Sequence, residues 1–296
     1  MNKILVTGAS GFIGSNLCKT LSEYGRSTRG SVRNLNLISA NTNIEYVSTG
    51  NINLNTNWKN ILIDVDCIIH CAARVHVMKE TKADLSEMYR SVNVDGTKQL
   101  AEQAAKAGVK RIIFLSSVKV NGECTDDHHR DINLNNHKKI FAYNDIPNPI
   151  DSYALSKFQA EKMLGEISLQ TGLEVTIVRL PLVYGYGVKG NLARLIKLVQ
   201  SGIPLPLGII LNQRSMIGID NLISLLICCV DHPDAANKIF LASDGKDLST
   251  PELINLIANS MGRKVRLFPF PVFLLKFFGS ILGKKKEMDR LVGSLK

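Results

Sequence analysis

The sequence predicts an α/β fold, in which a doubly wound parallel sheet is followed by a smaller, mostly helical lobe. Three observations support this prediction. Short apolar segments alternate with longer helical patterns over the first 180 residues, a glycine-rich turn directly follows the first apolar segment, and helical patterns predominate after Pro181. Continuous apolar runs are typical of parallel strands buried on both faces, and strand–helix alternation implies right-handed crossovers.

Five segments have the length and apolar character of buried strands, and helical patterns lie between and after them. The strands are expected at 3–8, 44–48, 66–73, 111–117 and 174–181. The helices are expected at about 11–24, 83–107, 151–171, 190–201, 219–231, 250–261 and 271–282. We therefore expect a sheet-containing domain over residues 1–180 and a smaller lobe over 181–296 that is partly intertwined with it.

The composition is that of an ordinary globular protein, with 45% hydrophobic and 21% charged residues and a formal net charge of +10. The lysines and arginines are mostly scattered singly, and the one run, "GKKK" at 283–286, predicts a solvated helix end. We therefore expect no nucleic-acid partner. No stretch reaches the roughly 20 apolar residues that a bilayer-spanning helix needs, and "MNKILVTGAS" lacks the apolar core of a signal peptide. A cytoplasmic protein is expected.

The cysteines and histidines predict no metal site. Six cysteines do not form a disulfide framework in a chain of this length, and no pair of CxxC units is present, so reduced core thiols are expected. His128, His129 and His137 lie in a polar segment whose spacing is too irregular for metal ligands, and which we expect to be a loop beside the substrate cleft. His70 and His76 flank a strand end.

The segment "VTGASGFIG" places three glycines at G-x-x-G-x-x-G spacing, directly after the first strand and at the start of a helix. The tight turn needs a residue without Cβ, and a pyrophosphate can then bind at the helix N-terminus. In this strand–turn–helix context the segment predicts a Rossmann-type dinucleotide-binding domain over residues 1–180. The expected cofactor contacts in this loop are Gly8, Ser10, Gly11, Phe12, Ile13 and Gly14.

The segment "RGSVRN", about 20 residues further on, determines which cofactor is expected. An acidic residue at the end of the second strand usually binds the adenine ribose of NAD, and this segment contains none. It offers Arg29 and Arg33 instead, and a guanidinium can pair with a 2′-phosphate, so NADP(H) is favoured over NAD(H). The alternative is that both arginines are surface residues. Further on, "TGNIN" places Asn51 and Ile52 where the adenine is expected.

The segment "YALSK" places Tyr153 and Lys157 four residues apart, on one face of a helix. A tyrosine that acts as acid or base at neutral pH needs its phenol pKa, ordinarily about 10, to be lowered. A nearby ammonium and a positively charged nicotinamide ring both have this effect. Ser117, at the end of a central strand, can hydrogen-bond the same substrate oxygen, although a serine there can also simply begin a loop.

With these segments the sequence resembles the extended short-chain dehydrogenase/reductase family, the group of nucleotide-sugar epimerases, dehydratases and reductases. The matching segments cover nearly the whole chain: "TGASGFIG", "DCIIHCAA", "SVNVDGT", "FLSSVKVNG", "YALSK", "RLPLVYG" and "NQRSMIGIDNL". The resemblance implies that Ser117, Tyr153 and Lys157 are the catalytic triad and that the enzyme is a homodimer. It implies further cofactor contacts from Ala72, Ala73, Asn93, Ser116, Pro181 and Val183, and contacts to the diphosphate of a UDP-sugar from Asn191 and Arg214.

The segment "SSVKVNGE" bears on which reaction is expected. Relatives that eliminate water carry an Asp-Glu pair directly after the Ser or Thr, where this chain has Val118 and Lys119, so a 4,6-dehydratase is not expected. Lys119 is a candidate substrate contact. The segments "AARVHVM", "SSVKVNGE", "GIPLPLG" and "SDGKDLSTPEL" resemble bacterial reductases that convert UDP-2-acetamido-2,6-dideoxy-4-keto-hexose to UDP-N-acetylquinovosamine for O-antigen and other surface polysaccharides. This favours a C4 reductase, and the alternative is a UDP-sugar 4-epimerase that retains NAD tightly.

Two further alternatives concern the second lobe and the role of the chain. If the sugar were carried on a polyprenyl diphosphate, the basic, apolar segment 268–286 would rest on a membrane surface, but we expect it to pack the second lobe as an amphipathic helix. Members of the resembling family run on past "RLVGSLK", so the lobe is expected to lack a last strand-and-helix segment. A scaffold without activity is disfavoured, because Ser117, Tyr153 and Lys157 are all present.

Overall fold

The structure, a computed structural model, describes residues 3–37, 44–75, 82–125 and 140–296. The chain divides into two compact units. Unit 1 consists of Met1–Gly122, Tyr143–Pro181 and Ile219–Ala242, and unit 2 of Glu123–Ala142, Leu182–Gly218 and Ser243–Lys296. The expected boundary at residue 180 falls beside Pro181, after which the chain passes from unit 1 to unit 2. Residues 219–242, which were expected in the second lobe, belong to unit 1.

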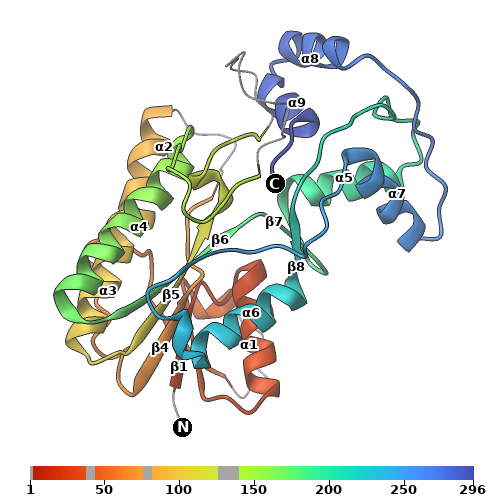
Figure 1. The fold of residues 1–296 in the computed structure, drawn as a ribbon. Coiled ribbons are helices and arrows are strands. Elements are labelled where there is room, and N and C mark those ends of the chain that lie inside the picture. The colour runs from red at the N-terminus through yellow and green to blue at the C-terminus, as the bar shows by residue number, and fades with distance from the viewer. Residues whose placement is uncertain (1–2, 38–43, 76–81, 126–139) are drawn as a thin grey trace. The chain divides into compact units, whose positions relative to one another are not determined.

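Unit 1 is built on a seven-stranded parallel sheet with the strand order β3-β2-β1-β4-β5-β6-β9 (Figure 1). The strands are β1 (Lys3–Thr7), β2 (Thr28–Val32), β3 (Glu45–Ser48), β4 (Val65–His70), β5 (Arg111–Ser117), β6 (Glu174–Leu180) and β9 (Ile239–Leu241). The strand order reverses between β1 and β4, and ligands of open α/β sheets bind at the carboxyl ends of the strands at such a point. The predicted doubly wound α/β fold is confirmed.

Helices cover both faces of this sheet, with α3 and α4 on one face and α1 and α6 on the other (Figure 1). Their bounds are α1 (Phe12–Glu23), α2 (Lys82–Tyr89), α3 (Gly96–Lys106), α4 (Ser152–Thr171) and α6 (Ile219–Asp231). A π-helical turn, η2 (Arg90–Asp95), separates α2 from α3, so the single helix expected over 83–107 is interrupted. Short 3₁₀ turns are η1 (Leu35–Leu37), η3 (Val118–Val120) and η4 (Pro233–Ala235).

A hydrophobic core lies between the sheet and the helices α3 and α4. Phe114, Ile112 and Ile68 of the central strands pack there against Leu100 and Leu164, and all five are buried. Burial of a side chain of this size stabilises the fold by about 1.5–3 kcal/mol. This packing holds β4 and β5 against α4, whose first turn contains Tyr153.

In its described residues, unit 2 contains a two-stranded parallel sheet and four helices. Its elements are β7 (Leu182–Tyr184), β8 (Met216–Gly218), α5 (Gly190–Gln200), α7 (Thr250–Ser260), α8 (Val272–Ile281) and α9 (Lys285–Val292). Val272 and Leu275 of α8 pack against the core of this unit, whereas Phe273, Phe277 and Ile281 are mostly exposed. Along the described ranges, no helix combines the length and the apolar character needed to cross a bilayer.

Candidate active site

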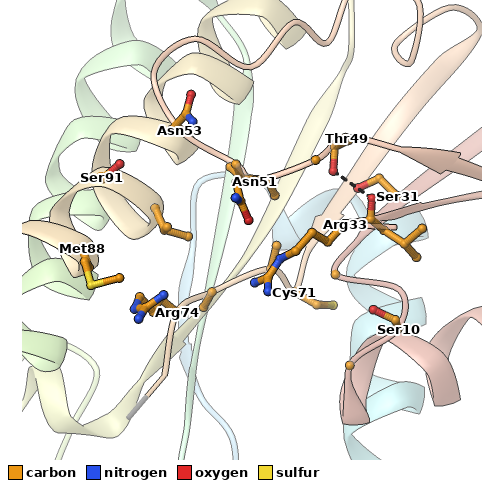
Figure 2. A pocket seen from close by; sticks show the side chains of 18 residues that line it. Ser10, Ser31, Arg33, Thr49, Asn51, Asn53, Cys71, Arg74, Met88 and Ser91 are labelled. Carbon is orange, nitrogen blue, oxygen red and sulfur yellow. Dashed lines mark hydrogen bonds between the residues drawn. The ribbon is translucent and has the colours of Figure 1, made fainter. Parts of the chain in front are cut away.

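A pocket of about 500 Å³ lies in unit 1 beside the carboxyl ends of β1, β2 and β4 (Figure 2). Eight predicted cofactor contacts line it: Gly8, Ser10, Gly11, Arg33, Asn51, Ile52, Ala72 and Ala73. The remaining lining residues were not predicted: Ser31, Val32, Thr49, Gly50, Asn53, Cys71, Arg74, Met88, Ser91 and Val92. They come from β2, α2, the turn η2 and the loops that follow β3 and β4.

The glycine loop forms the floor of this pocket, and two of its glycines are required by close backbone contacts. Gly8 has φ +66°, and a Cβ on it would lie 2.9 Å from the backbone of Ala72. A Cβ on Gly14 would lie 2.3 Å from the carbonyl oxygen of Gly8. The N-cap of α1 is Gly11, which offers no capping side chain, and the first turn has no acidic residue. The first N–H groups of α1 therefore suit an anion such as a pyrophosphate.

Of the two arginines predicted at the cofactor, only Arg33 lies at the pocket. Arg29 is buried within β2, where its guanidinium donates to the carbonyl oxygens of Ile61 (2.6 Å) and Ile63 (2.9 Å) and pairs with Glu45 of β3 at 2.8 Å. The prediction that Arg29 meets the cofactor is therefore wrong. Arg33 follows β2 and is exposed, and Figure 2 shows its side chain extending into the pocket.

A buried hydroxyl in the pocket wall also points to a polar ligand. Ser31 lines the pocket and is only 1% exposed, and its Oγ has no hydrogen-bond partner among the described residues. A buried hydroxyl left without a partner costs about 1–3 kcal/mol. A polar group of a bound dinucleotide would relieve this cost, so the wall fits such a cofactor.

A buried polar chain beneath the pocket joins β1, β4 and α3. The Thr97 hydroxyl donates to the Asn93 carbonyl at 2.8 Å, so it must accept from His70 Nε2, which lies 3.0 Å away. His70 Nδ1 then accepts from the Thr7 hydroxyl at 2.7 Å, and Thr7 accepts from the Ala72 amide at 3.1 Å. Burial lowers the pKa of His70 to about 3, so the ring is neutral, with its proton on Nε2.

This histidine predicts a loss of stability in mild acid. The unfolded chain takes up a proton on His70 near pH 6.5 and the folded chain only near pH 3, so stability falls as the pH drops through this window. Between pH 6.5 and 5 the loss from this group is about 2 kcal/mol. Urea unfolding at the two pH values measures it. His70→Gln should flatten the dependence, whereas His232→Gln, at an exposed histidine, should not; equal slopes in all three proteins would contradict the assignment.

Asn93, a predicted cofactor contact, connects the pocket to α4. Its Oδ1 accepts from the Arg74 amide at 2.8 Å, and its Nδ2 donates to the Arg74 carbonyl at 3.1 Å and to Ser156 Oγ at 3.0 Å. Ser156 Oγ in turn donates to the Tyr153 carbonyl at 2.8 Å. Asn93 lies in the π-helical turn η2, a distortion that often occurs at functional sites. The pocket loop and the first turn of α4 are thus linked.

Ser117 and the Lys157 ammonium both lie at the carboxyl end of β5. Ser117 ends the strand, and its Oγ accepts from the Lys119 amide at 3.3 Å. Lys157 is buried, donates from Nζ to the Leu115 carbonyl at 2.8 Å and lies 4.4 Å from the ring centroid of Phe114. Burial lowers the pKa of Lys157 to about 8. The lysine is therefore anchored two residues before Ser117.

Tyr153 lies in the first turn of α4, with its ring edge-on to Tyr89 of α2 at a centroid distance of 5.9 Å. Burial raises the pKa of Tyr153 well above its ordinary value, and the charge of Asp151 and the nearby Tyr89 raise it further. The Lys157 ammonium does not produce the lowering that the sequence predicts. Among the described residues, those that shift the pKa of Tyr153 therefore favour the protonated phenol.

Ser116, another predicted cofactor contact, has its side chain in the core. Its Oγ donates to Glu161 of α4, whose other oxygen pairs with Arg179 of β6 at 2.7 Å. Arg179 also donates to Asn121 Oδ1 at 3.0 Å. This buried ion pair fastens α4 to β6, and the Ser116 hydroxyl supports α4 through Glu161.

The remaining predicted contacts are distributed over both units. Pro181 follows β6 in unit 1, and Val183 lies in β7 of unit 2. Asn191 is exposed in the first turn of α5. Arg214, shortly before β8, donates from its guanidinium to the carbonyl oxygen of Arg290 in α9. The two predicted diphosphate contacts therefore belong to unit 2.

The described residues offer no metal-ligand cluster. Within these ranges no three His, Cys, Asp or Glu side chains form a group that could hold a metal ion, and the six cysteines are free thiols. The predictions for His76, His128, His129 and His137 fall outside the described residues. His70 packs in the buried polar chain described above.

Sequence comparisons agree with this geometry. The profile of the NAD dependent epimerase/dehydratase family matches residues 4–242. A UDP-glucose 4-epimerase of Vibrio cholerae is 41% identical over 304 aligned residues, which cover 99% of this chain and 86% of the relative. An N-acetyl-alpha-D-glucosaminyl-diphospho-ditrans,octacis-undecaprenol 4-epimerase of Escherichia coli O157:H7 is 27% identical, over 96% of this chain and 82% of the relative.

Solved structures share the fold. The UDP-glucuronic acid 4-epimerase of Bacillus cereus, in complex with UDP-glucuronic acid and NAD, has a TM-score of 0.75 at 22% identity, over 90% of this chain and 86% of the other. The UDP-N-acetylglucosamine 4-epimerase of Bacillus cereus has a TM-score of 0.74 at 20% identity, over 90% and 84%. At these identities the comparison establishes the architecture.

Proposed function

Because the chain belongs to the NAD dependent epimerase/dehydratase family, we propose that it is a UDP-sugar 4-epimerase that works with NAD held in the pocket of unit 1. The observation that carries this proposal is the link through Asn93, which ties the pocket loop to the turn of α4 with Tyr153. The relative with 41% identity is itself a UDP-glucose 4-epimerase.

The epimerase is better supported than the reductase that the sequence analysis favours. That preference rested partly on two arginines at the end of the second strand, and Arg29 is occupied by Glu45 and two carbonyl groups. It rested also on resemblance to reductases, whereas the relatives compared above are 4-epimerases. A C4 reductase is therefore the alternative activity that the assay must distinguish from the epimerase.

In the proposed reaction, bound NAD supplies a hydride acceptor and donor for C4 of the sugar. Tyr153 takes the proton of the C4 hydroxyl and returns it once the 4-keto sugar presents its other face. The Ser117 hydroxyl hydrogen-bonds the same oxygen. Elimination of water would need further acid–base groups after Ser117, but Val118 is apolar and Lys119 is paired with Asp151.

Binding of the cofactor and the substrate is assigned as follows. Gly8, Gly11 and the first amides of α1, from Phe12 to Gly14, hold the pyrophosphate of NAD. Asn51, Ile52, Ala72 and Ala73 line the rest of the pocket, with Pro181 and Val183 assigned to the nicotinamide amide. Asn191 and Arg214 bind the diphosphate of the UDP-sugar, since a guanidinium matches phosphate oxygens.

The assay that tests the function uses purified protein without added cofactor. UDP-glucose, UDP-N-acetylglucosamine and UDP-glucuronic acid are supplied separately, and NMR of the products should show the C4 epimer of at least one of them. UDP-4-keto-6-deoxy-N-acetylglucosamine with NADPH is the parallel reaction. Consumption of NADPH there, with no epimer formed from any of the three sugars, would show a reductase instead.

Arg33 is expected to set the preference between the two dinucleotides. Its guanidinium reaches into the pocket, where it can pair with a 2′-phosphate that NADP has and NAD lacks. Arg33→Ala should lower the ratio of NADP⁺ to NAD⁺ affinity by about tenfold, which corresponds to about 1.4 kcal/mol. Titration calorimetry with both dinucleotides measures this ratio. Lys59→Ala, at an exposed cation that does not line the pocket, is the control, and an unchanged ratio in Arg33→Ala would contradict the role.

A further inference from the structure

One ion pair joins the two segments that carry the catalytic hydroxyl groups. Lys119 Nζ lies 2.7 Å from Asp151 Oδ2, and each side chain is only 19% exposed. Lys119 belongs to η3, the turn that directly follows Ser117, and the Lys119 amide donates to Ser117 Oγ. Asp151 precedes α4, and its other oxygen, Oδ1, caps the helix by accepting from the Ala154 amide at 2.7 Å.

A second contact fastens the same two segments. The Asn148 amide donates to the Val120 carbonyl at 2.9 Å, so the residues that lead into α4 are also tied to η3 by backbone. Ser117 stands two residues before Lys119, and Tyr153 stands two residues after Asp151. The ion pair thus joins the two segments that carry the groups needed by the proposed reaction.

The charged groups near Tyr153 show why the positive charge of Lys119 matters. Lys157 lies on the same helix as Tyr153, and Asp151 caps that helix. Tyr89 faces Tyr153 from α2, and Lys119 reaches the start of α4 from η3. Asp151 raises the pKa of Tyr153, which opposes its use as a base. A cation held 2.7 Å from that carboxylate offsets part of the effect.

We propose that the Lys119–Asp151 ion pair is a positioning pair for the reaction, which locks η3 onto the start of α4 and neutralises the carboxylate beside the catalytic tyrosine. This role rests on the proposed function, in which Tyr153 is the acid and base at C4. It gives Lys119 a task within the protein, in place of the substrate contact that the sequence suggested. A carboxylate at position 119 would instead face Asp151 with like charge.

Three variants separate the charge of the pair from its packing. Lys119→Met keeps most of the side-chain volume without the charge, and Lys119→Arg keeps the charge. Asp151→Asn removes the charge but keeps a good N-cap, since Asn and Asp cap helices about equally well. In the pH profile of kcat/KM, the rising limb set by Tyr153 should move up by about one pH unit in Lys119→Met and down in Asp151→Asn. It should stay near the wild-type position in Lys119→Arg.

A direct titration of the phenol provides a second readout. The near-ultraviolet absorbance of phenolate is followed against pH in the NAD-loaded protein, and the Tyr153→Phe trace is subtracted to isolate Tyr153. Thermal unfolding shows that each variant is folded. If the Tyr153 titration and the rising limb stayed in place in both Lys119→Met and Asp151→Asn, the pair would only be structural and the proposal would be wrong. If the wild type epimerised no UDP-sugar, the proposed function would fail, whereas the phenolate titration would still judge the pair.

Discussion

Tyr153→Phe is expected to lower epimerase activity by about 10²–10⁴-fold, because in the proposed reaction it removes the hydroxyl that moves the C4 proton in both directions. The ring, its packing against Tyr89 and the backbone bond from Ser156 all remain, so the fold and the binding of NAD should be unchanged. Initial rates with the accepted UDP-sugar, together with the NAD content of the purified protein, measure both parts of this prediction.

The control for this variant is Tyr24→Phe. Tyr24 directly follows α1 in the same unit, is 68% exposed and lies outside the cofactor pocket. Loss of its hydroxyl should therefore leave the rate within about twofold of wild type. The assignment would be contradicted by a Tyr153→Phe protein that binds NAD normally and still turns over at the wild-type rate.

Gly14→Ala should have the largest effect on the cofactor. The new Cβ would lie 2.3 Å from the carbonyl oxygen of Gly8 and 2.9 Å from its carbonyl carbon. Both are backbone atoms, so the glycine loop must shift rather than a side chain. We expect the protein to lose its NAD and to be destabilised by about 1–3 kcal/mol, the usual cost of overpacking. NAD content and urea unfolding measure the two losses.

Gly165→Ala provides a matched control, since it makes the same substitution at another glycine within a helix. A Cβ on Gly165, in α4, would meet nothing within 4 Å, and its φ is not positive. Alanine should therefore stabilise the protein by about 0.5–1 kcal/mol and leave the NAD content unchanged. Retention of NAD by Gly14→Ala would contradict the close packing described for the loop.

Local chemistry explains why the sequence predicts part of this site well. The glycine loop is recognisable because the tight turn and the uncapped helix start depend on residues within one short segment. The spacing of Tyr153 and Lys157 places them on one helix face wherever the helix lies. Their segments are therefore found by pattern. In the structure Ser117 ends β5, and the Lys157 ammonium of α4 binds the Leu115 carbonyl of the same strand.

The parts that the sequence does not predict depend on contacts between distant residues. Arg29 and Arg33 look equivalent in "RGSVRN", and only the pairing of β2 with β3, which brings Glu45 to Arg29, distinguishes them. The Tyr153 environment is another case, because the residues that raise its pKa include Tyr89, 64 positions earlier in the chain. The assignment of residues 219–242 to unit 1 likewise follows from the packing of α6 on α1.

In the proposed reaction the hydrogen at C4 leaves the sugar and returns to the same carbon within one enzyme site. The most direct test uses the accepted UDP-sugar with deuterium at C4, in ordinary water and without added cofactor. We expect the epimer to form and to keep its deuterium at C4, as measured by mass spectrometry and NMR. Formation of an epimer that has exchanged this deuterium for a solvent proton would contradict the proposed reaction, as would recovery of the labelled sugar unchanged from folded, NAD-containing protein.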